Sequence, residues 1–134
     1  MTMKKFFTTV LALTLVLGAL LSLSACGNKL TMDKIGKRLT EKGITYYTEE
    51  GEANEWEEEV EEELGETVSV KTVYRFVVLD DGYVIEFETE EDAEISVRMF
   101  QEFAQDEEEF TFRREGKIIA YGERDTVNDI MRVD

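Results

Sequence analysis

Residues 68–88 read VSVKTVYRFVVLDDGYVIEFE, and this stretch decides the fold. From Val68 to Val78, apolar and aromatic side chains alternate with mostly polar ones, which is the period of two of a β-strand. Asp80-Asp81-Gly82 is typical of a tight turn, and beyond it apolar side chains alternate with Glu86 and Glu88. The stretch therefore predicts a β-hairpin with strands over residues 67–79 and 83–88.

The segment after the hairpin carries a helix-start signal. Thr89 is followed three residues later by Asp92, the spacing of a capping box, in which the Thr89 hydroxyl accepts from the Asp92 amide while the Asp92 carboxylate bonds back. We expect a helix over 90–104. Strands over 109–114 and 117–122 follow around Gly116, and Asp125 can cap a final helix.

The segments before the hairpin are read in the same way. Thr31 can cap a helix over 32–42 that Gly43 ends, and residues 44–48 are typical of a short strand. Residues 49–66 hold 11 Glu and no Lys or Arg. Apolar side chains nevertheless recur there at i, i+4 and i+8 from Trp56, which predicts an acidic helix over 53–64.

The order from residue 44 to residue 114 is therefore β-α-β-β-α-β, the order of a ferredoxin-like fold. We expect the α+β class, with an antiparallel sheet that carries its helices on one face. An N-terminal helix and a C-terminal strand and helix would extend this unit. Residues 32–134 form one predicted α+β domain, with no internal repeat.

The N-terminus carries a targeting pattern. Lys4 and Lys5 precede an apolar run from Phe6 to Leu23, and the small residues Ser24 and Ala25 then precede Cys26. Leu23-Ser24-Ala25-Cys26 resembles the lipobox of bacterial lipoproteins. The resemblance implies a diacylglycerol on the Cys26 sulfur and cleavage between Ala25 and Cys26. Residues 1–25 would then be a cleaved signal peptide and residues 26–31 a lipidated tether.

Two other interpretations of this segment remain open. Phe6 to Leu23 could be an uncleaved membrane anchor, although 18 residues lie at the short end of what spans a bilayer. Cys26 could instead stay a thiol, but as the only cysteine it can form no intramolecular disulfide. With lipidation, we expect the domain on the extracytoplasmic face of a bacterial cell membrane, most simply in a Gram-positive cell.

Composition excludes several classes of function. The chain has a net charge of −16, and loss of Lys4 and Lys5 with the signal peptide would leave −18, which argues against nucleic-acid binding. There is no His, the commonest general base and metal ligand. Ser69 and Ser96, the only serines after residue 25, lie in no nucleophile motif. We expect no catalytic residue, metal or cofactor, and so no enzyme.

The acidic helix is the first candidate binding surface. Its carboxylates could select a basic protein or a cationic envelope component through charge complementarity. The alternative is a solvated helix face that keeps a surface protein soluble. The candidate residues are Glu55, Glu58, Glu59, Glu62 and Glu63.

The first helix carries a basic stripe. Lys34, Arg38 and Lys42 recur at i, i+4 and i+8, just beyond the predicted lipid. They could face anionic headgroups, each worth about 1 kcal/mol close to the surface. The alternative is pairing with the acidic helix, where exposed ion pairs contribute only about 0–1 kcal/mol.

Aromatic residues offer a further choice between core and contact. We expect Trp56, Tyr74 and Tyr83 to fill the core, and Tyr47 to be the best candidate for an exposed contact, since it lies on the opposite strand face from Tyr46.

These observations predict a membrane-anchored, non-enzymatic binding module of the cell envelope. An envelope hydrolase with a carboxylate pair is the alternative in another class. A third possibility is an inhibitor or immunity-type lipoprotein that binds through a protruding loop at Gln105–Glu109.

Overall fold

The computed structural model describes residues 29–105 and 107–133. Leu30–Arg132 form one compact unit. The predicted signal peptide, with Ala25 and Cys26, lies outside the described residues, so the predicted lipobox stays a prediction. Among the residues described, no helix is both long enough and apolar enough to cross a membrane.

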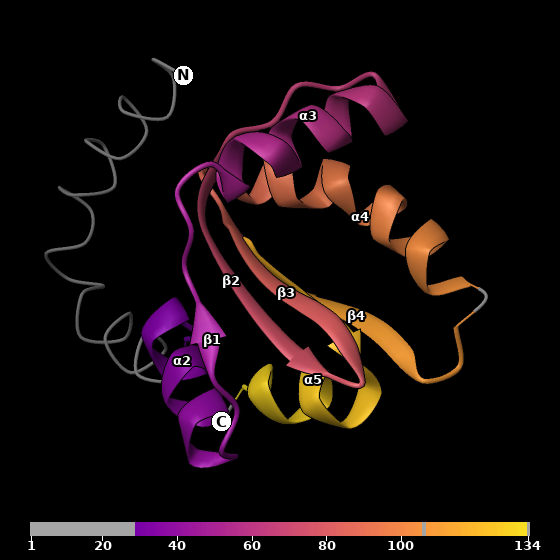
Figure 1. Cartoon of the computed structure of the whole chain (residues 1–134). Helices are drawn as coiled ribbons and strands as arrows, with labels where there is room; N and C mark the ends of the chain where they lie inside the picture. The colour runs from indigo at the N-terminus through magenta and orange to yellow at the C-terminus, as the bar shows by residue number, and fades with distance from the viewer. Residues whose placement is uncertain (1–28, 106, 134) are drawn as a thin grey trace, which may run out of the picture. The chain divides into compact units, whose positions relative to one another are not determined.

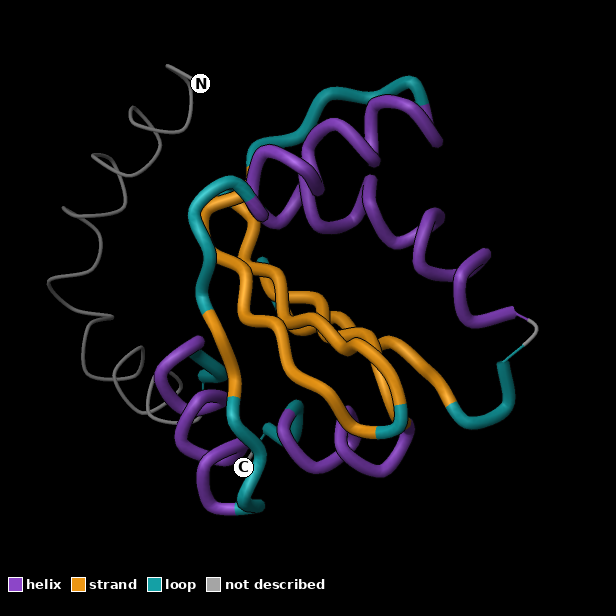
Figure 2. The backbone as a smooth tube through the Cα atoms, in the orientation of Figure 1, coloured by secondary structure: helices purple, strands orange, loops and turns teal. Residues whose placement is uncertain are grey.

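The compact unit is built on one five-stranded antiparallel sheet, whose strand order is β1-β2-β3-β5-β4. Figure 2 shows the short β1 beside β2 at one edge of this sheet. The strands are β1 (Tyr46–Tyr47), β2 (Val70–Val78), β3 (Asp80–Phe87), β4 (Phe110–Glu115) and β5 (Ile118–Glu123).

Helices cover both faces of the sheet. One pair packs on one face and the other pair on the opposite face, so the compact unit has three layers (Figure 1). The first face carries α3 (Glu52–Leu64) and α4 (Glu90–Gln105), and the second carries α2 (Met32–Glu41) and α5 (Arg124–Ile130).

The structure confirms the α+β class and the predicted succession of elements, with bounds that differ by a few residues. It does not confirm the ferredoxin-like arrangement. A split β-α-β unit needs another strand between its two parallel strands, whereas β1 pairs directly and antiparallel with β2. The expectation of helices on one face holds for α3 and α4 only, because α2 and α5 cover the second face.

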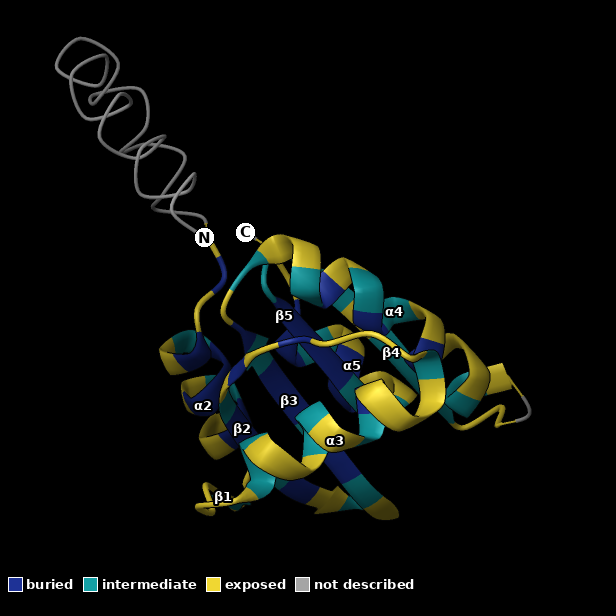
Figure 3. Ribbon diagram, turned by 90° about the horizontal axis from the view of Figure 1, so that it is seen from above, coloured by how far each residue is buried: buried dark blue, intermediate teal, exposed yellow. Residues whose placement is uncertain are grey.

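Two hydrophobic cores follow from this coverage. Because successive side chains of a strand point to opposite faces, Val84 packs under α2 and α5 while its neighbour Ile85 packs under α3 and α4. Figure 3 shows the strands as the buried centre of the unit and exposed residues on the outer faces of the helices. A sheet covered on both faces needs apolar residues at consecutive positions, as the central strands have.

The hairpin turn lies earlier than predicted. Leu79, with φ of 71°, makes the turn, and Asp80, Asp81 and Gly82 belong to β3. The glycine serves another purpose: a Cβ at position 82 would lie 2.5 Å from the ring of Phe76, its partner across the hairpin. Gly82 therefore makes room for an aromatic ring.

Helix caps agree with the sequence at α2 and in part at α4. Thr31 accepts from the Lys34 amide at 3.2 Å. Thr89 accepts from the Asp92 amide at 3.0 Å, but the Asp92 carboxylate accepts from the amide of Ser69 at 3.3 Å instead of bonding back. Asp92 thus ties the start of α4 to the segment that leads into β2.

The predicted cap of α5 is wrong. Glu123 is the N-cap residue, and Asp125 lies in the first turn. The Glu123 carboxylate accepts from the amides of Asp125 and Thr126 and from the Thr126 hydroxyl, the last at 2.6 Å. A Glu can cap here because its longer side chain reaches the amides that a shorter cap residue usually satisfies.

Candidate functional site

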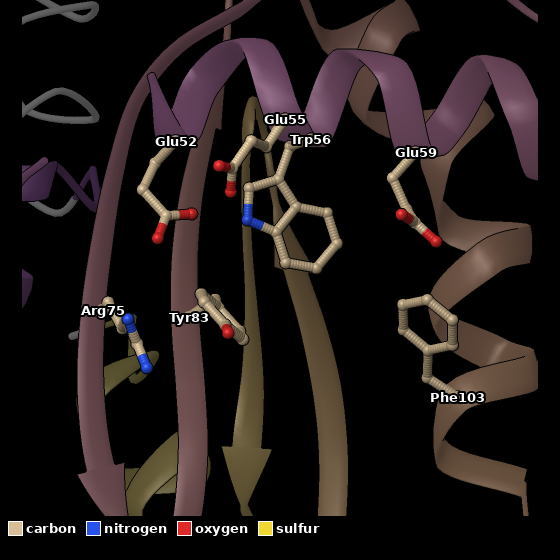
Figure 4. Close-up of a pocket in the computed structure, with 7 residues that line it drawn as sticks. All are labelled: Glu52, Glu55, Trp56, Glu59, Arg75, Tyr83 and Phe103. Atoms are coloured by element: carbon tan, nitrogen blue, oxygen red, sulfur yellow. The ribbon is translucent and has the colours of Figure 1, made fainter. Parts of the chain in front are cut away.

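An open hollow of about 340 Å³ lies among α3, the C-terminal half of α4 and the sheet (Figure 4). It combines acidic and aromatic side chains from three elements with one cation. Its lining residues are Glu52, Glu55, Trp56, Glu59, Arg75, Tyr83 and Phe103.

Helix α3 supplies one wall of the hollow. Glu52, Glu55, Trp56 and Glu59 are spaced so that they share one helical face. The N-terminal turn of a helix favours negative charge because its amide groups point outward. The first-turn glutamates therefore fit their positions in the helix as well as the hollow.

The sheet supplies the floor. Arg75 of β2 is the register partner of Tyr83 on β3, so the two side chains lie next to each other on the α3 side of the sheet. The Arg75 guanidinium lies 3.3 Å from both carboxylate oxygens of Asp81. Asp81 therefore holds the guanidinium of Arg75, the only cationic side chain in the lining, close to the sheet.

The aromatic side chains form a connected group. The ring of Trp56 lies 5.0 Å from that of Tyr83, nearly at right angles to it, and 6.5 Å from that of Phe103. Trp56 also stacks on the buried Phe100 at 5.4 Å. Trp56 and Tyr83 are half-buried and pack against the core while they line the hollow, so the core prediction for them holds in part.

The carboxylates of the hollow are crowded. Burial raises the pKa of the Glu52 carboxyl, the neighbouring Glu55 carboxylate raises it further, and Arg75 partly opposes both. The Asp81 carboxylate raises the pKa of the Arg75 guanidinium. Burial, followed by the Asp81 charge, raises the pKa of the Tyr83 hydroxyl. The hollow therefore holds more negative charge than its single cation offsets.

This chemistry suits an organic cation. Aromatic rings attract cations, and carboxylates supply the opposite charge. The arrangement does not suit a metal ion, because no three carboxylate or other ligating side chains in residues 29–105 and 107–133 are grouped to hold one. The hollow can bind an ammonium or guanidinium group with its hydrocarbon stem.

The structure brings together two of the five acidic residues singled out from the sequence. Glu55 and Glu59 line the hollow, whereas Glu58, Glu62 and Glu63 are exposed on α3 outside it. Sequence reasoning missed Glu52, although its spacing from Trp56 is a signal that could have found it. Arg75 and Phe103 were also missed, because neither helical spacing nor strand alternation shows which elements meet at the hollow.

Of the predicted membrane-facing residues, Lys34 and Arg38 lie on α2 and Lys42 is its C-cap residue, across the sheet from α3. Arg38 donates to the carbonyls of Ile130 and Arg132 at 3.0 and 2.6 Å. Lys42 pairs with Asp129 of α5 at 2.6 Å, and this hydrogen bond lowers the pKa of the Asp129 carboxyl. Arg38 and Lys42 thus contact α5 and the segment after it, on the opposite face of the sheet from the acidic helix. Headgroup contact by Lys34, Arg38 and Lys42 stays a prediction.

The structure also describes the aromatic residues and most of the loop that the sequence singled out as core or contact. Tyr74 is buried, as expected, and Tyr47 is 55% exposed, which confirms it as a surface residue. The loop that ends at Glu109 is tied to α5, because the Arg124 guanidinium donates twice to the Glu108 carbonyl, at 3.1 and 3.0 Å.

Comparison with protein-family models, with curated proteins and with solved structures found no match. The proposed function therefore rests on the geometry of the site.

Proposed function

We propose that this protein is a membrane-anchored extracytoplasmic lipoprotein whose compact unit is a non-enzymatic binding module. Its partner would be a basic protein or another cationic component of the cell envelope. The lipobox resemblance at Cys26 supports the location. The acidic face of α3, with its concave end at Glu52 and Glu55, carries the binding proposal.

Charge supports this choice of partner. Helix α3 has no basic residue, and all eight of its glutamates are exposed or half-exposed. A field of one sign raises the rate of encounter with oppositely charged partners and disfavours like-charged ones. The lipid would confine the protein to the membrane surface, and the charge would select cationic partners at that surface.

Capture of the partner from solubilised membranes tests the proposal. The lipidated full chain serves as bait, beside a variant with five α3 glutamates changed to glutamine. We expect the variant to lose a stoichiometric partner, because the complementary charge is gone. The changed residues are Glu55, Glu58, Glu59, Glu62 and Glu63.

A second variant controls for net charge. It also loses five carboxylates, all of them exposed and outside α3. It should retain the partner, and equal capture by the two variants would contradict binding through the α3 face. Its changed residues are Glu88, Glu91, Glu102, Glu107 and Glu108.

One observation favours a second candidate, an envelope hydrolase with a carboxylate pair. A general acid needs a raised pKa, and burial and Glu55 raise that of Glu52 at the hollow. Release of sugars from cell-wall polysaccharide that Glu52→Gln abolishes would favour the hydrolase. Absence of any release by the unaltered protein would leave the binding module.

A further inference from the structure

Exposed apolar side chains lie on the same face of the sheet as the hollow. Val77 is 59% exposed and Tyr47 is 55% exposed, so both side chains are open to contact from outside. Tyr47 is the register partner of Arg75, and Val77 follows Arg75 by two residues on the same strand, so all three share one face. This part of the face is left uncovered beyond the start of α3.

The hollow and these apolar residues are continuous. Arg75 lines the hollow and stands between Tyr47 on one side and Tyr83 on the other. Val77 lies across from Asp81, the carboxylate that pairs with Arg75. We use the name docking surface for the hollow together with Tyr47 and Val77.

The charge of the docking surface selects its occupant. Glu52, Glu55 and Glu59 line the hollow, and the only lining cation, Arg75, is already paired with Asp81. An incoming cation therefore meets carboxylates that lack a partner cation of their own in the lining. Beside them, Tyr47 and Val77 offer apolar contact next to the Arg75–Asp81 pair.

We infer that the docking surface binds a segment of a partner protein in which a lysine or arginine stands beside an apolar residue. The cationic group enters the hollow between the α3 carboxylates and the rings of Trp56 and Tyr83, and the apolar side chain packs on Tyr47 and Val77. This inference rests on the proposed binding function and names the chemistry of its partner.

The size of the hollow agrees with a single side chain. About 340 Å³ is near the lower end of the range for small-molecule sites, about 300–1,000 Å³, and those sites enclose their ligand. This hollow is open, so it suits a group carried by a larger molecule. Lysine and arginine also bury a hydrocarbon stem against apolar surface while their charge stays at a polar site.

Trp56 makes the test direct, because it is the only tryptophan in the chain and lines the hollow. The full chain is titrated with the capped peptide Gly-Ile-Arg-Ile-Gly while tryptophan emission is recorded. We expect a saturable change in Trp56 emission. A peptide with Gln in place of Arg, or with Ser in place of both Ile, should bind at least about fivefold more weakly, the factor that corresponds to roughly 1 kcal/mol.

Matched variants of α3 locate the peptide. Glu52→Gln with Glu55→Gln should weaken binding about tenfold, since each lost ion pair at an exposed site weakens binding by up to about fivefold. Glu62→Gln with Glu63→Gln removes the same charge from the same helix outside the hollow, and should change binding less than about twofold. Equal weakening by both pairs would mean a diffuse charge effect and would overturn the inference.

A third variant tests the apolar half. Val77→Ser, at an exposed position, should weaken the Arg peptide about threefold and leave the Ser-flanked peptide unchanged. Equal affinity for tetramethylammonium and the peptide would make the hollow a small-cation site and overturn the docking surface.

The two proposals fail separately. If membrane capture depends on the α3 glutamates but the peptide leaves Trp56 emission unchanged, the proposed function stands and the docking surface is wrong. If the peptide binds as expected but no membrane partner is captured, the docking surface stands without the envelope function.

Discussion

Phe76 occupies space that only a glycine at position 82 leaves free. Its ring is fully buried under α2 and α5, and a Cβ on Gly82 would come within 2.5 Å of it. Gly122 of the next strand would place a Cβ 3.2 Å from the same ring. Two glycines on neighbouring strands thus leave the space that the Phe76 ring fills. The sequence Asp80-Asp81-Gly82 is typical of a turn and does not indicate this packing role.

Substitution of Gly82 tests this packing against Phe76. Gly82→Ala should lower the free energy of unfolding by about 1–3 kcal/mol, the usual cost of overpacking. Urea denaturation measures the change. Combination with Phe76→Leu should be less harmful than the sum of the two single changes, because the smaller side chain removes the clash. Strict additivity would contradict the contact.

The candidate site was only partly predictable from single residues. Glu55 and Glu59 stood out through the charge of their helix, and Glu52 lies four residues before Trp56, on the same helical face. Arg75 lies on β2, and Phe103 lies on α4, far from α3 in sequence. Their meeting depends on which elements pack together, and no local pattern contains that information.

Helix α5 is capped at its start by one side chain, that of Glu123. The Thr126 hydroxyl, with the amides of Thr126 and Asp125, holds the pKa of the Glu123 carboxyl below its ordinary value of 4.5. A lowered pKa in the folded state means that the carboxylate stabilises the fold at neutral pH. That stabilisation is present above about pH 4.5 and is lost as the pH falls through the folded-state pKa.

Glu123→Gln separates this charge from the shape of the cap, because glutamine resembles the protonated side chain. At pH 7 the variant should be less stable by up to about 1 kcal/mol, within the range of N-cap substitutions. The difference should shrink as the pH falls below 4.5. Unfolding free energies from urea titrations between pH 3 and pH 7 measure it, and a constant difference would refute the role of the charge.

Local signals predicted the elements well, since a strand or a helix is encoded by neighbours in sequence. Thr31 caps the start of α2, and Gly43, with φ of 77°, follows its end, both as expected. Pairing of strands is not local in this sense. Nothing in residues 44–48 indicates that this strand adds to the edge beside β2, so the ferredoxin-like order was a reasonable inference from the succession of elements alone.

The chain as a whole combines a strongly acidic unit with a predicted lipid. An unlipidated unit of charge −18 would be repelled by an anionic bilayer. Two acyl chains are enough for stable anchoring, with about 0.8 kcal/mol for each buried methylene. In the lipoprotein proposal, the lipid on Cys26 would hold the acidic unit at the membrane against this repulsion.

Cys26→Ser should abolish acylation and block the lipoprotein cleavage, because serine offers no thiol for the diacylglycerol. Labelled fatty acid measures acylation, and the mass of the chain measures cleavage. Ser24→Ala keeps a small residue two positions earlier and should leave both unchanged. Retention of label in Cys26→Ser would contradict the lipoprotein proposal.

The sheet joins two hairpins, β2–β3 and β4–β5, along a single line of pairing from Tyr83↔Tyr121 to Glu86↔Ile118. Each hairpin can close within microseconds from neighbouring residues. Pairing of the two hairpins closes a loop of residues 87–117, and this closure costs conformational entropy. We expect this closure to limit the folding rate, and a chain delayed there to expose unfinished strand edges to other chains.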